Sequence, residues 1–294
     1  MTGQRQLMGT PPAASAARET PGPLRADVIR AAVADGPDGL GGSGGPGGLW
    51  TSVEVVASTG STNADLLARG GPEGQVLVAE EQTAGRGRAG RTWVSAPGAS
   101  LTVSVLLRPT SVQPAARGWL PLLTGVAVAA AVRSAAGVAA VLKWPNDVLV
   151  GDRKLAGMLA EQSPAEDAVV VGVGLNVATP EEALPVSPTG LPATSLLVEG
   201  ANVAREALLI EILGRLEREY LAFRADPDPA RSGLLAAYAA ACATLGRTVR
   251  VELPAGRVLV GLAEGIDQGG RLLVRPADAA SATPVSAGDV VHLR

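Results

Sequence analysis

The sequence predicts a mixed α/β domain followed by a small β-barrel, and three changes in composition along the chain support this fold class. Residues 1–48 are rich in Gly, Pro, Ala and Ser and lack apolar periodicity, which predicts a disordered tail with a flexible linker. Residues 49–243 alternate apolar runs of strand length with longer runs at helical spacing, which predicts one α/β domain. Residues 244–294 carry short apolar runs separated by Gly and Pro turns, which is typical of a small β-barrel.

Each expected element has a local signal. Ser61 or Thr62 can cap a helix that ends before Gly70, a residue suited to the left-handed C-terminal position. Runs rich in Val and Leu predict strands, and apolar residues at helical spacing predict the later helices. In chain order we expect a helix over 61–69, strands over 76–80 and 101–107, a core helix over 117–136, strands over 141–150, 154–161 and 168–174, helices over 208–220 and 231–243, and barrel strands over 249–253, 257–261, 271–274 and 289–293. Residues 23–33 could form a helix on binding or in a crystal contact.

The composition of the 294-residue chain excludes several kinds of site. One cysteine, Cys242, and one histidine, His292, exclude an internal disulfide and a Cys/His zinc site. A Ser-His-Asp triad is disfavoured because the only imidazole lies near the C-terminus. A net charge of −3, with only four Trp, two Tyr and one Phe, disfavours nucleic-acid binding. Catalysis is therefore expected from carboxylates, Lys, Arg, backbone dipoles or a hard metal ion.

No segment predicts membrane insertion. The longest uncharged apolar run lies between Arg117 and Arg133, whereas a bilayer-spanning helix needs roughly 20 apolar residues. A buried core helix is the better interpretation of that run. The N-terminus has no compact apolar segment typical of a secretory signal, so we expect a cytoplasmic protein.

The first candidate site is the run Gly85–Trp93, in which glycines alternate with Arg86, Arg88 and Arg91. Glycine lets the backbone approach a ligand closely, and arginine presents a fork of donors suited to carboxylate and phosphate oxygens. The alternative is a flexible basic loop that binds nothing, or one that contacts RNA.

The second candidate site is the run Lys143–Val150, followed by a turn and a strand that begins at Lys154. We expect a hairpin in which Lys143 and Asp147 share one strand and Lys154 enters from its neighbour. Asp147 could hold Mg²⁺ directly or through water. A lysine at the start of an apolar strand loses solvation free energy unless it meets an anion, so Lys143 favours an anionic ligand. The alternative is a surface hairpin whose Lys–Asp pair contributes little.

The third candidate site is the run Val169–Val177, a buried strand with small residues near its end. Gly172 and Gly174 leave room for a flat ring, and Asn176 could bond that ring or a ribose. The alternative is a core strand with a bulge. The run is not a dinucleotide fingerprint, because no G-x-G-x-x-G pattern precedes a helix.

Together, these runs resemble those of the biotin protein ligases. The similarity lies in six segments in the same order: Ser61-Thr62-Asn63, Glu81-Gln82-Thr83, Gly85–Trp93, Lys143–Asp147, Lys154–Gly157 and Gly172–Asn176. The resemblance implies a mixed β-sheet flanked by helices, related to the class II aminoacyl-tRNA synthetase core, and a C-terminal SH3-like barrel. It points to the type without an N-terminal DNA-binding domain, so no DNA binding is expected.

The implied reaction has two steps. Biotin and ATP give biotinyl-5′-AMP and pyrophosphate, and a lysine of the biotin carboxyl carrier domain of acetyl- or propionyl-CoA carboxylase then takes the biotinyl group. The resemblance implies the following roles: biotin binding by Ser61, Thr62, Asn63, Gln82, Arg86, Arg88, Trp93, Lys154 and Gly157; ATP binding by Arg88, Arg91, Trp93, Lys143, Asn146 and Asn176; catalysis by Lys154, Arg88 and Arg86; and Mg²⁺ binding by Asp147.

Three other functions were weighed against this one. Lipoate ligases share the implied core but carry a different glycine-rich motif, so Gly85–Trp93 favours biotin. A nucleic-acid-binding protein would use the arginine loop and the barrel, against the acidic net charge. An inactive biotin sensor would lack a site residue, and none of the expected residues is missing.

Overall fold

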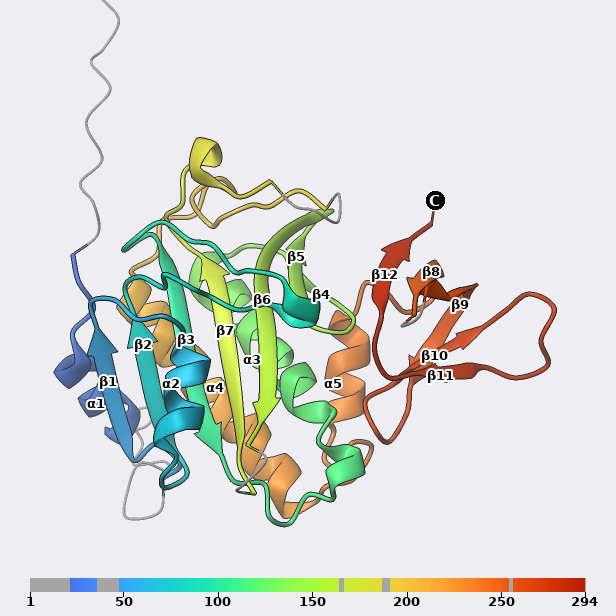
Figure 1. Ribbon diagram of the computed structural model, residues 1–294, viewed down its shortest axis with the longest axis horizontal. Helices are drawn as coiled ribbons and strands as arrows, with labels where there is room; N and C mark the ends of the chain where they lie inside the picture. The colour runs from blue at the N-terminus through green and yellow to red at the C-terminus, as the bar shows by residue number, and fades with distance from the viewer. Residues whose placement is uncertain (1–21, 36–47, 164–166, 187–190, 254–255, 294) are drawn as a thin grey trace, which may run out of the picture.

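The computed structural model describes residues 22–35, 48–163, 167–186, 191–253 and 256–293. The strands of this part of the chain form a large and a small β-sheet (Figure 1). The large sheet has seven strands in the order β1-β2-β3-β7-β6-β5-β4. Its strands are β1 Ser52–Val56, β2 Gln75–Ala79, β3 Ser100–Leu107, β4 Ala140–Lys143, β5 Asp147–Val150, β6 Arg153–Gln162 and β7 Val169–Asn176. Only β1 and β2 run parallel; the other neighbouring pairs are antiparallel.

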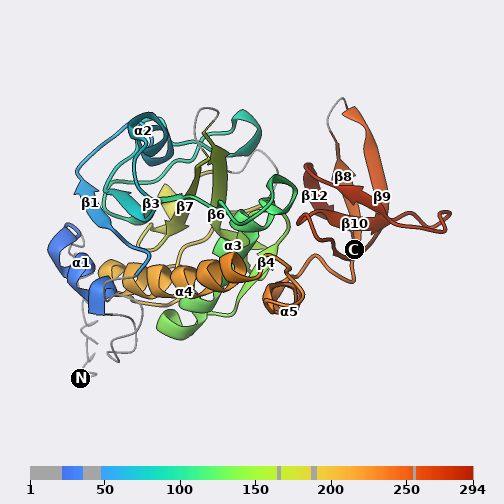
Figure 2. The same cartoon turned by 90° about the horizontal axis from the view of Figure 1, so that it is seen from below.

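Helices cover both faces of this sheet (Figure 2). Helix α2, Thr62–Arg69, lies alone on one face, and the amide of Ala64 donates to the Ser61 hydroxyl, which confirms the predicted cap. Helices α3, Trp119–Ala136, and α4, Arg205–Ala225, lie on the other face. Helix α5, Leu234–Ala241, packs against α3 next to the small sheet.

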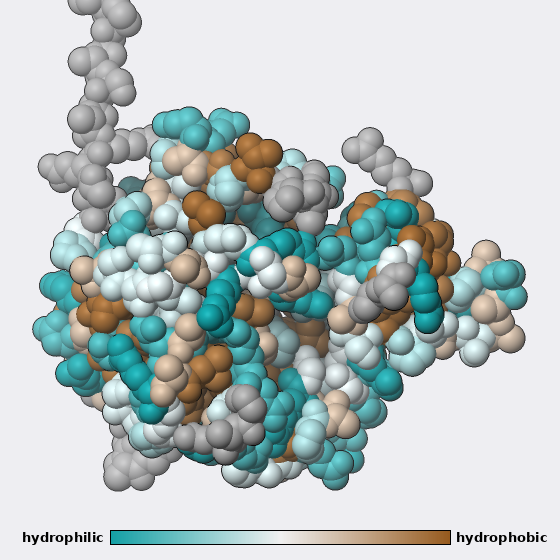
Figure 3. Space-filling view, viewed as in Figure 1, coloured by the Kyte–Doolittle hydropathy of each residue, from teal (hydrophilic) through white to brown (hydrophobic). Residues whose placement is uncertain are grey.

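Helix α3 is buried on most of its circumference, as the uncharged run predicted. It packs between α4 and strands of the large sheet. Among the described residues, only this helix with its preceding turn, Pro114–Ala136, is long and apolar enough to cross a bilayer, and most of it lies inside the protein. The face of the molecule shown in Figure 3 is largely hydrophilic, with apolar side chains in separate small patches.

The small sheet forms the C-terminal part of the chain and confirms the predicted β-rich unit. Its order is β11-β10-β9-β8-β12, all antiparallel, with β8 Thr248–Glu252, β9 Val258–Ile266, β10 Leu272–Arg275, β11 Thr283–Val285 and β12 Asp289–His292. Two buried tryptophans hold it to the large domain. The indole of Trp119 donates to Asp267 O and Gln268 O, and the indole of Trp144 donates to Gly270 O.

The predicted single strand over 141–150 is wrong, because the chain turns at residues 144–146 and forms two strands, β4 and β5. Lys143 and Asp147 therefore face each other as cross-strand partners instead of sharing a strand. The following turn into β6 is the predicted hairpin. The prediction also missed two short strands, β1 and β11.

The predicted disordered tail is wrong for residues 26–35, which form helix α1. Ile29 and Val33, four residues apart on one helix face, are buried with Leu24 against α4 and β1. The amide of Leu24 donates to Glu80 Oε1 at 2.6 Å, and Arg25 pairs with Glu206 at 2.9 Å. The rest of the predicted tail, 1–21 and 36–47, lies outside the described residues.

Candidate active site

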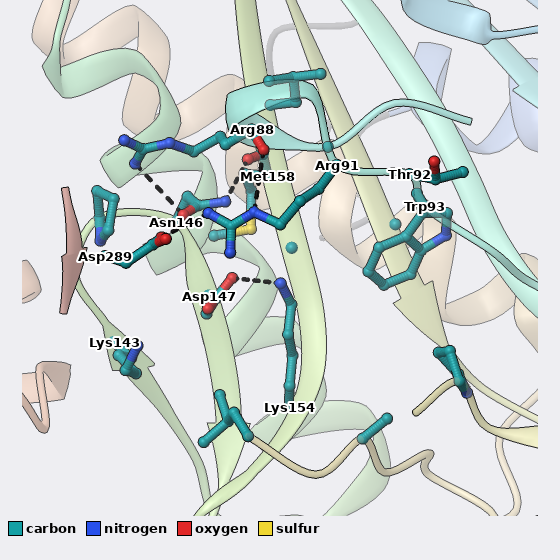
Figure 4. A pocket seen from close by; sticks show the side chains of 18 of the residues that line it. Arg88, Arg91, Thr92, Trp93, Lys143, Asn146, Asp147, Lys154, Met158 and Asp289 are labelled. Carbon is teal, nitrogen blue, oxygen red and sulfur yellow. Dashed lines mark hydrogen bonds and ion pairs between the residues drawn. The ribbon is translucent and has the colours of Figure 1, made fainter. Parts of the chain in front are cut away.

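A cavity of about 980 Å³ opens where β6 and β7 of the large sheet meet the 85–93 loop, the 143–147 turn and strand β12 (Figure 4). Every residue for which the sequence predicted a ligand contact lines this cavity: Ser61, Thr62, Asn63, Gln82, Arg86, Arg88, Arg91, Trp93, Lys143, Asn146, Asp147, Lys154, Gly157 and Asn176. Segments far apart in the chain thus meet at one site. We call the part lined by Ser61, Thr62, Asn63 and Gln82 the neutral end, and the part lined by Arg88, Arg91, Lys143, Asp147 and Lys154 the charged end.

The neutral end is a buried hydrogen-bond network. The first turn of α2 supplies Ser61, Thr62 and Asn63, all less than 5% exposed. The Gln82 amide oxygen accepts from the Thr62 amide at 2.8 Å and lies 3.0 Å from the Thr62 hydroxyl oxygen. These bonds fix the polar atoms before any ligand arrives, which favours recognition of a ligand with matching donors and acceptors.

The charged end brings cations and acids together (Figure 4). Lys154 Nζ lies 2.7 Å from Asp147 Oδ1, and the Asp147 oxygen accepts no hydrogen bond of good geometry. Arg88 donates to the Asn146 side-chain oxygen at 3.4 Å, a long and weak contact. Arg91 pairs with Asp289 of β12, so the small sheet also contributes to this end.

Burial makes this concentration of positive charge costly without a ligand. It lowers the pKa of the Lys143 ammonium, against the opposing effect of the facing Asp147 carboxylate. Burial also lowers the pKa of the Arg88 guanidinium, again opposed by Asp147. An anionic ligand would supply the missing counter-charge, so the electrostatics of this end fit a carboxylate or phosphate.

The arginine loop is closed on itself by backbone hydrogen bonds. The amide of Trp93 donates to Gly85 O at 2.9 Å, and the amide of Gly87 donates to Arg91 O at 2.7 Å. At the tip, Ala89 has a φ of 53°, a left-handed conformation that is strained for a residue with a Cβ atom. The loop is thus a formed but strained structure at the entrance of the cavity.

Two glycines of β7 are required by close neighbours. A Cβ atom on Gly174 would lie 2.3 Å from the Trp93 ring, and one on Gly172 would lie 2.3 Å from the Asn63 side-chain oxygen. In this conformation, the Trp93 indole occupies the space at Gly174 that was predicted to take a flat ring, and the Asn63 side chain occupies the space at Gly172. Its Nε1 is buried without a hydrogen-bond partner among the described residues, and Lys154 Nζ lies 6.0 Å from its ring centre.

Asn176 is the predicted residue least available to a ligand. It is 2% exposed, and its amide donates to Thr194 O at 2.9 Å. In this conformation it holds the 192–196 segment beside β6. Its predicted contact with adenine or ribose stays a prediction.

Sequence reasoning missed several polar residues of the site. Glu161 pairs with Arg86 at 3.3 Å, and Asp289 pairs with Arg91. His292 Nε2 lies 3.0 Å from the Thr244 hydroxyl, which accepts from the amide of Trp144 in the 143–147 turn. Burial lowers the pKa of His292 to about 4, aided by nearby Lys143. Ser104 lies between two valines of β3 and Glu161 follows the apolar run of β6, and a polar side chain beside such runs is the sequence signal for these two residues.

Three carboxylates line the cavity, those of Asp147, Asp152 and Asp289. The described residues contain no group of three or more His, Cys, Asp and Glu side chains placed to hold a metal ion. Of the three carboxylates, Asp147 faces Lys143 across the strand pair, and its buried Oδ1 pairs with Lys154 Nζ at 2.7 Å. Mg²⁺ is commonly held by one or two carboxylates together with substrate phosphates, so this donor set fits Mg²⁺ that arrives with a nucleotide.

Two family models match the chain. Residues 52–177 match the biotin/lipoate A/B protein ligase family, and residues 244–293 match the biotin protein ligase C-terminal domain. Both matched segments contribute side chains to the cavity, the first through the motifs and the second through β12.

Relatives and solved structures agree with these models. The biotin–[acetyl-CoA-carboxylase] ligase of Mycobacterium tuberculosis is 47% identical over 85% of this chain and 92% of its own length. The bifunctional ligase/repressor BirA of Escherichia coli is 34% identical over 76% of this chain and 69% of its own length. The Aquifex aeolicus biotin protein ligase in complex with biotin and ATP superposes with a TM-score of 0.68 at 28% identity, covering 83% of this chain and all of that one. The chain belongs to the biotin protein ligase family.

Proposed function

We propose that this protein activates biotin with ATP and transfers it to a lysine of a biotin carboxyl carrier domain. The observation that carries the proposal is the joining of two unlike ends in one cavity. The neutral end suits a polar, uncharged ureido ring, and the charged end suits a carboxylate next to a triphosphate. A ligase of this kind must hold both groups at once.

The first step joins two anions. A biotin carboxylate oxygen attacks the α-phosphorus of ATP, the bond from that phosphorus to the bridging oxygen breaks, and pyrophosphate leaves. The barrier is largely electrostatic and positional, which agrees with a charged end whose cations are Arg and Lys side chains.

Side chains of the charged end provide the counter-charge in this proposal. Lys154 bridges the biotin carboxylate and the α-phosphate, and Arg88 contacts both groups. Arg91 meets the ATP phosphates, and Lys143 adds positive charge behind them. All of them line the cavity, and the lowered pKa values of Lys143 and Arg88 support an anionic ligand here.

Side chains of the neutral end orient the ring. Ser61, Thr62 and Gln82 bond the ureido group, with Asn63 behind them and the backbone near Arg86 and Gly157 beside it. The Trp93 indole covers the apolar chain of biotin or packs near adenine, and Asn176 lies near the nucleoside.

Asp147 and Asn146 are the residues that would hold Mg²⁺. When bound, the ion withdraws charge from the phosphates and aligns the leaving pyrophosphate. The ion pair with Lys154 keeps the Asp147 carboxylate in place at the charged end.

The second step transfers the activated acyl group. A neutral lysine amine of the carrier domain attacks the carbonyl carbon of biotinyl-5′-AMP, the bond from that carbon to the phosphate oxygen breaks, and AMP leaves. The nitrogen loses a proton to solvent or to AMP. A carrier domain of acetyl-CoA carboxylase fits the name of the Mycobacterium tuberculosis relative. Propionyl-CoA carboxylase as a second partner and a cytoplasmic location are further parts of the proposal.

The test is transfer of labelled biotin. The full chain is incubated with ATP, Mg²⁺, labelled biotin and an apo carrier domain, and a carrier with its target lysine replaced by arginine serves as control. We expect label on the first carrier and none on the second. Label on neither carrier, with no pyrophosphate released, would overturn the proposal.

Lipoate is the second substrate to test, because the matched family model includes lipoate ligases. Calorimetric titration with biotin and with lipoate separates the two. We expect heat of binding with biotin alone.

A further inference from the structure

Two side chains that do not line the cavity connect to its neutral end. Ser104 of β3 is fully buried, and Glu161 of β6 lies beside the arginine loop. Both are bonded to Asn63, which lies between them over β7. Gly172 leaves the space that the Asn63 amide occupies.

The contacts of Asn63 fix which way its amide points. Its Nδ2 donates to Leu159 O at 3.1 Å and to Glu161 Oε2 at 2.8 Å. Both partners can only accept, so a flipped amide would set oxygen against oxygen on that side. The Asn63 oxygen must therefore point to Ser104, whose hydroxyl lies 2.6 Å away.

From Asn63, a row of four oxygens leads to the cavity. The spacings are 2.6 Å from Asn63 Oδ1 to Ser104 Oγ, 2.7 Å from Ser104 Oγ to Thr62 Oγ1, and 3.0 Å from Thr62 Oγ1 to Gln82 Oε1. Both ends of the row are amide oxygens, which only accept. Two hydroxyl protons must therefore serve three contacts, and one contact always lacks a proton.

The neighbouring bonds determine which contact goes without a proton. Gln82 Oε1 already accepts from the Thr62 amide at 2.8 Å, whereas Ser104 is the only hydrogen-bond donor recorded for Asn63 Oδ1 in the described part of the chain. The favoured arrangement has Ser104 donating to Asn63 and Thr62 donating to Ser104. Lone pairs of Thr62 Oγ1 and Gln82 Oε1 are then left to face the cavity as acceptors.

We propose that Ser104 and Glu161 are positioning residues that set the neutral end to accept N–H groups, and so select a ureido ring. The inference deepens the proposed function and rests on it. A ureido ring brings two N–H donors to these two acceptors. A lipoyl dithiolane ring brings none and would leave buried acceptors unpaired, the kind of mismatch that gives strong rejection.

Glu161 also links this network to the arginine loop. Its other oxygen, Oε1, lies 3.3 Å from Arg86 Nη1. One carboxylate therefore bonds both the amide behind the neutral end and the loop at the entrance.

The experiment compares biotin with a cyclic carbamate analogue in which oxygen replaces one ring N–H. Dissociation constants of both ligands are measured by calorimetry on the full chain, for the wild type and for S104A and E161A. We expect the Kd for biotin to rise about tenfold in each variant, with a smaller rise for the carbamate, so the preference for biotin narrows.

A second substitution of Glu161 separates its contact with Asn63 from its ion pair with Arg86, and a variant elsewhere serves as control. E161Q keeps an oxygen that accepts from Asn63 but removes the charge that pairs with Arg86, so its Kd for biotin should stay within about threefold of the wild type. E54A is the matched control. Like Glu161, Glu54 lies in a strand and pairs with an arginine, Arg69, at 2.6 Å, but it lies outside the cavity. It should leave both dissociation constants unchanged.

Equal rises for the two ligands in S104A and E161A would indicate general loss of packing and would overturn the inference, as would no rise at all. An E161Q as impaired as E161A would assign the effect to Arg86 and would also overturn it. Should S104A fail to fold, E161A carries the same test at a side chain that is 27% exposed. A wild type that binds no biotin would overturn the proposed function itself, before any variant is compared.

Discussion

The neutral and charged ends of the cavity differ in how completely they are formed without a ligand. At the neutral end, Thr62 and Asn63 are buried, and Gln82, Thr62, Ser104 and Asn63 form a row of polar contacts at 2.6–3.0 Å. At the charged end, Asp147 pairs with Lys154 at 2.7 Å, but Arg88 makes only a 3.4 Å side-chain contact, and Lys143 has no ion pair within the described residues. The difference indicates that the neutral end sets selectivity in advance, whereas the charged end is completed by anions.

The largest expected effect comes from removing the lysine of the charged end. In K154A the adenylation rate should fall about a hundredfold to a thousandfold, because the developing charge loses one direct donor. Pyrophosphate release measures that rate, and the affinity for biotinol, the uncharged alcohol of biotin, should stay close to that of the wild type.

The matched control for this lysine is its neighbour in the same strand. Arg153 pairs with Glu199 at 2.8 Å and is 44% exposed, so R153A should leave the rate unchanged. An unchanged rate of pyrophosphate release in folded K154A would contradict the role of the lysine.

The next largest effect comes from filling the space between the two ends. In G174A the added methyl group would lie 2.3 Å from the Trp93 ring, so the indole must move within the cavity. We expect the Kd for biotin to rise about tenfold, with a change in tryptophan fluorescence. G265A, where the nearest atom to the added methyl is 4.0 Å away, is the control. Unchanged biotin affinity in G174A would show that the indole position is unimportant for binding.

A smaller effect is expected from salt, which should weaken ligand binding at the charged end and leave binding at the neutral end unchanged. Raising the ionic strength from about 0.05 M to about 0.5 M shortens the Debye length and should raise the KM for ATP about threefold. The affinity for uncharged biotinol should not change. Equal sensitivity of both ligands would remove the distinction between the ends.

The smallest expected effect concerns His292, which links β12 to the 143–147 turn through Thr244. Because its pKa is lowered from 6.5 to about 4, the folded state binds fewer protons than the unfolded state between these values. This contribution to stability is therefore complete above pH 6.5 and is lost as the pH falls towards 4. Thermal unfolding at pH 7 and pH 4.5 should show a smaller loss of Tm for H292N than for the wild type. Equal losses of Tm in H292N and the wild type would show that protonation of His292 does not contribute to the loss of stability at low pH.

Local sequence signals were enough to predict most of the helices and strands. The Ser61 cap, the uncharged run of α3 and the turn-rich C-terminal strands each depend on neighbouring residues. The residues that line the cavity were predicted because a family resemblance joined segments that no local rule connects.

The remaining features depend on tertiary pairing. Lys143 faces Asp147 only because the chain turns between them. Helix α1 is stable because Leu24 and Ile29 meet α4 and β1, which no composition rule reveals in a Gly- and Pro-rich region. The roles inferred for Ser104 and Glu161 depend on strands β3 and β6 lying on either side of β7.

The most direct test is a crystal structure of the full chain with biotin and a non-hydrolysable ATP analogue. We predict the ureido ring within hydrogen-bond distance of Thr62 and Gln82, and the biotin carboxylate and α-phosphate between Lys154 and Arg88. A ring lodged at the charged end, or either ligand bound outside this cavity, would contradict the account.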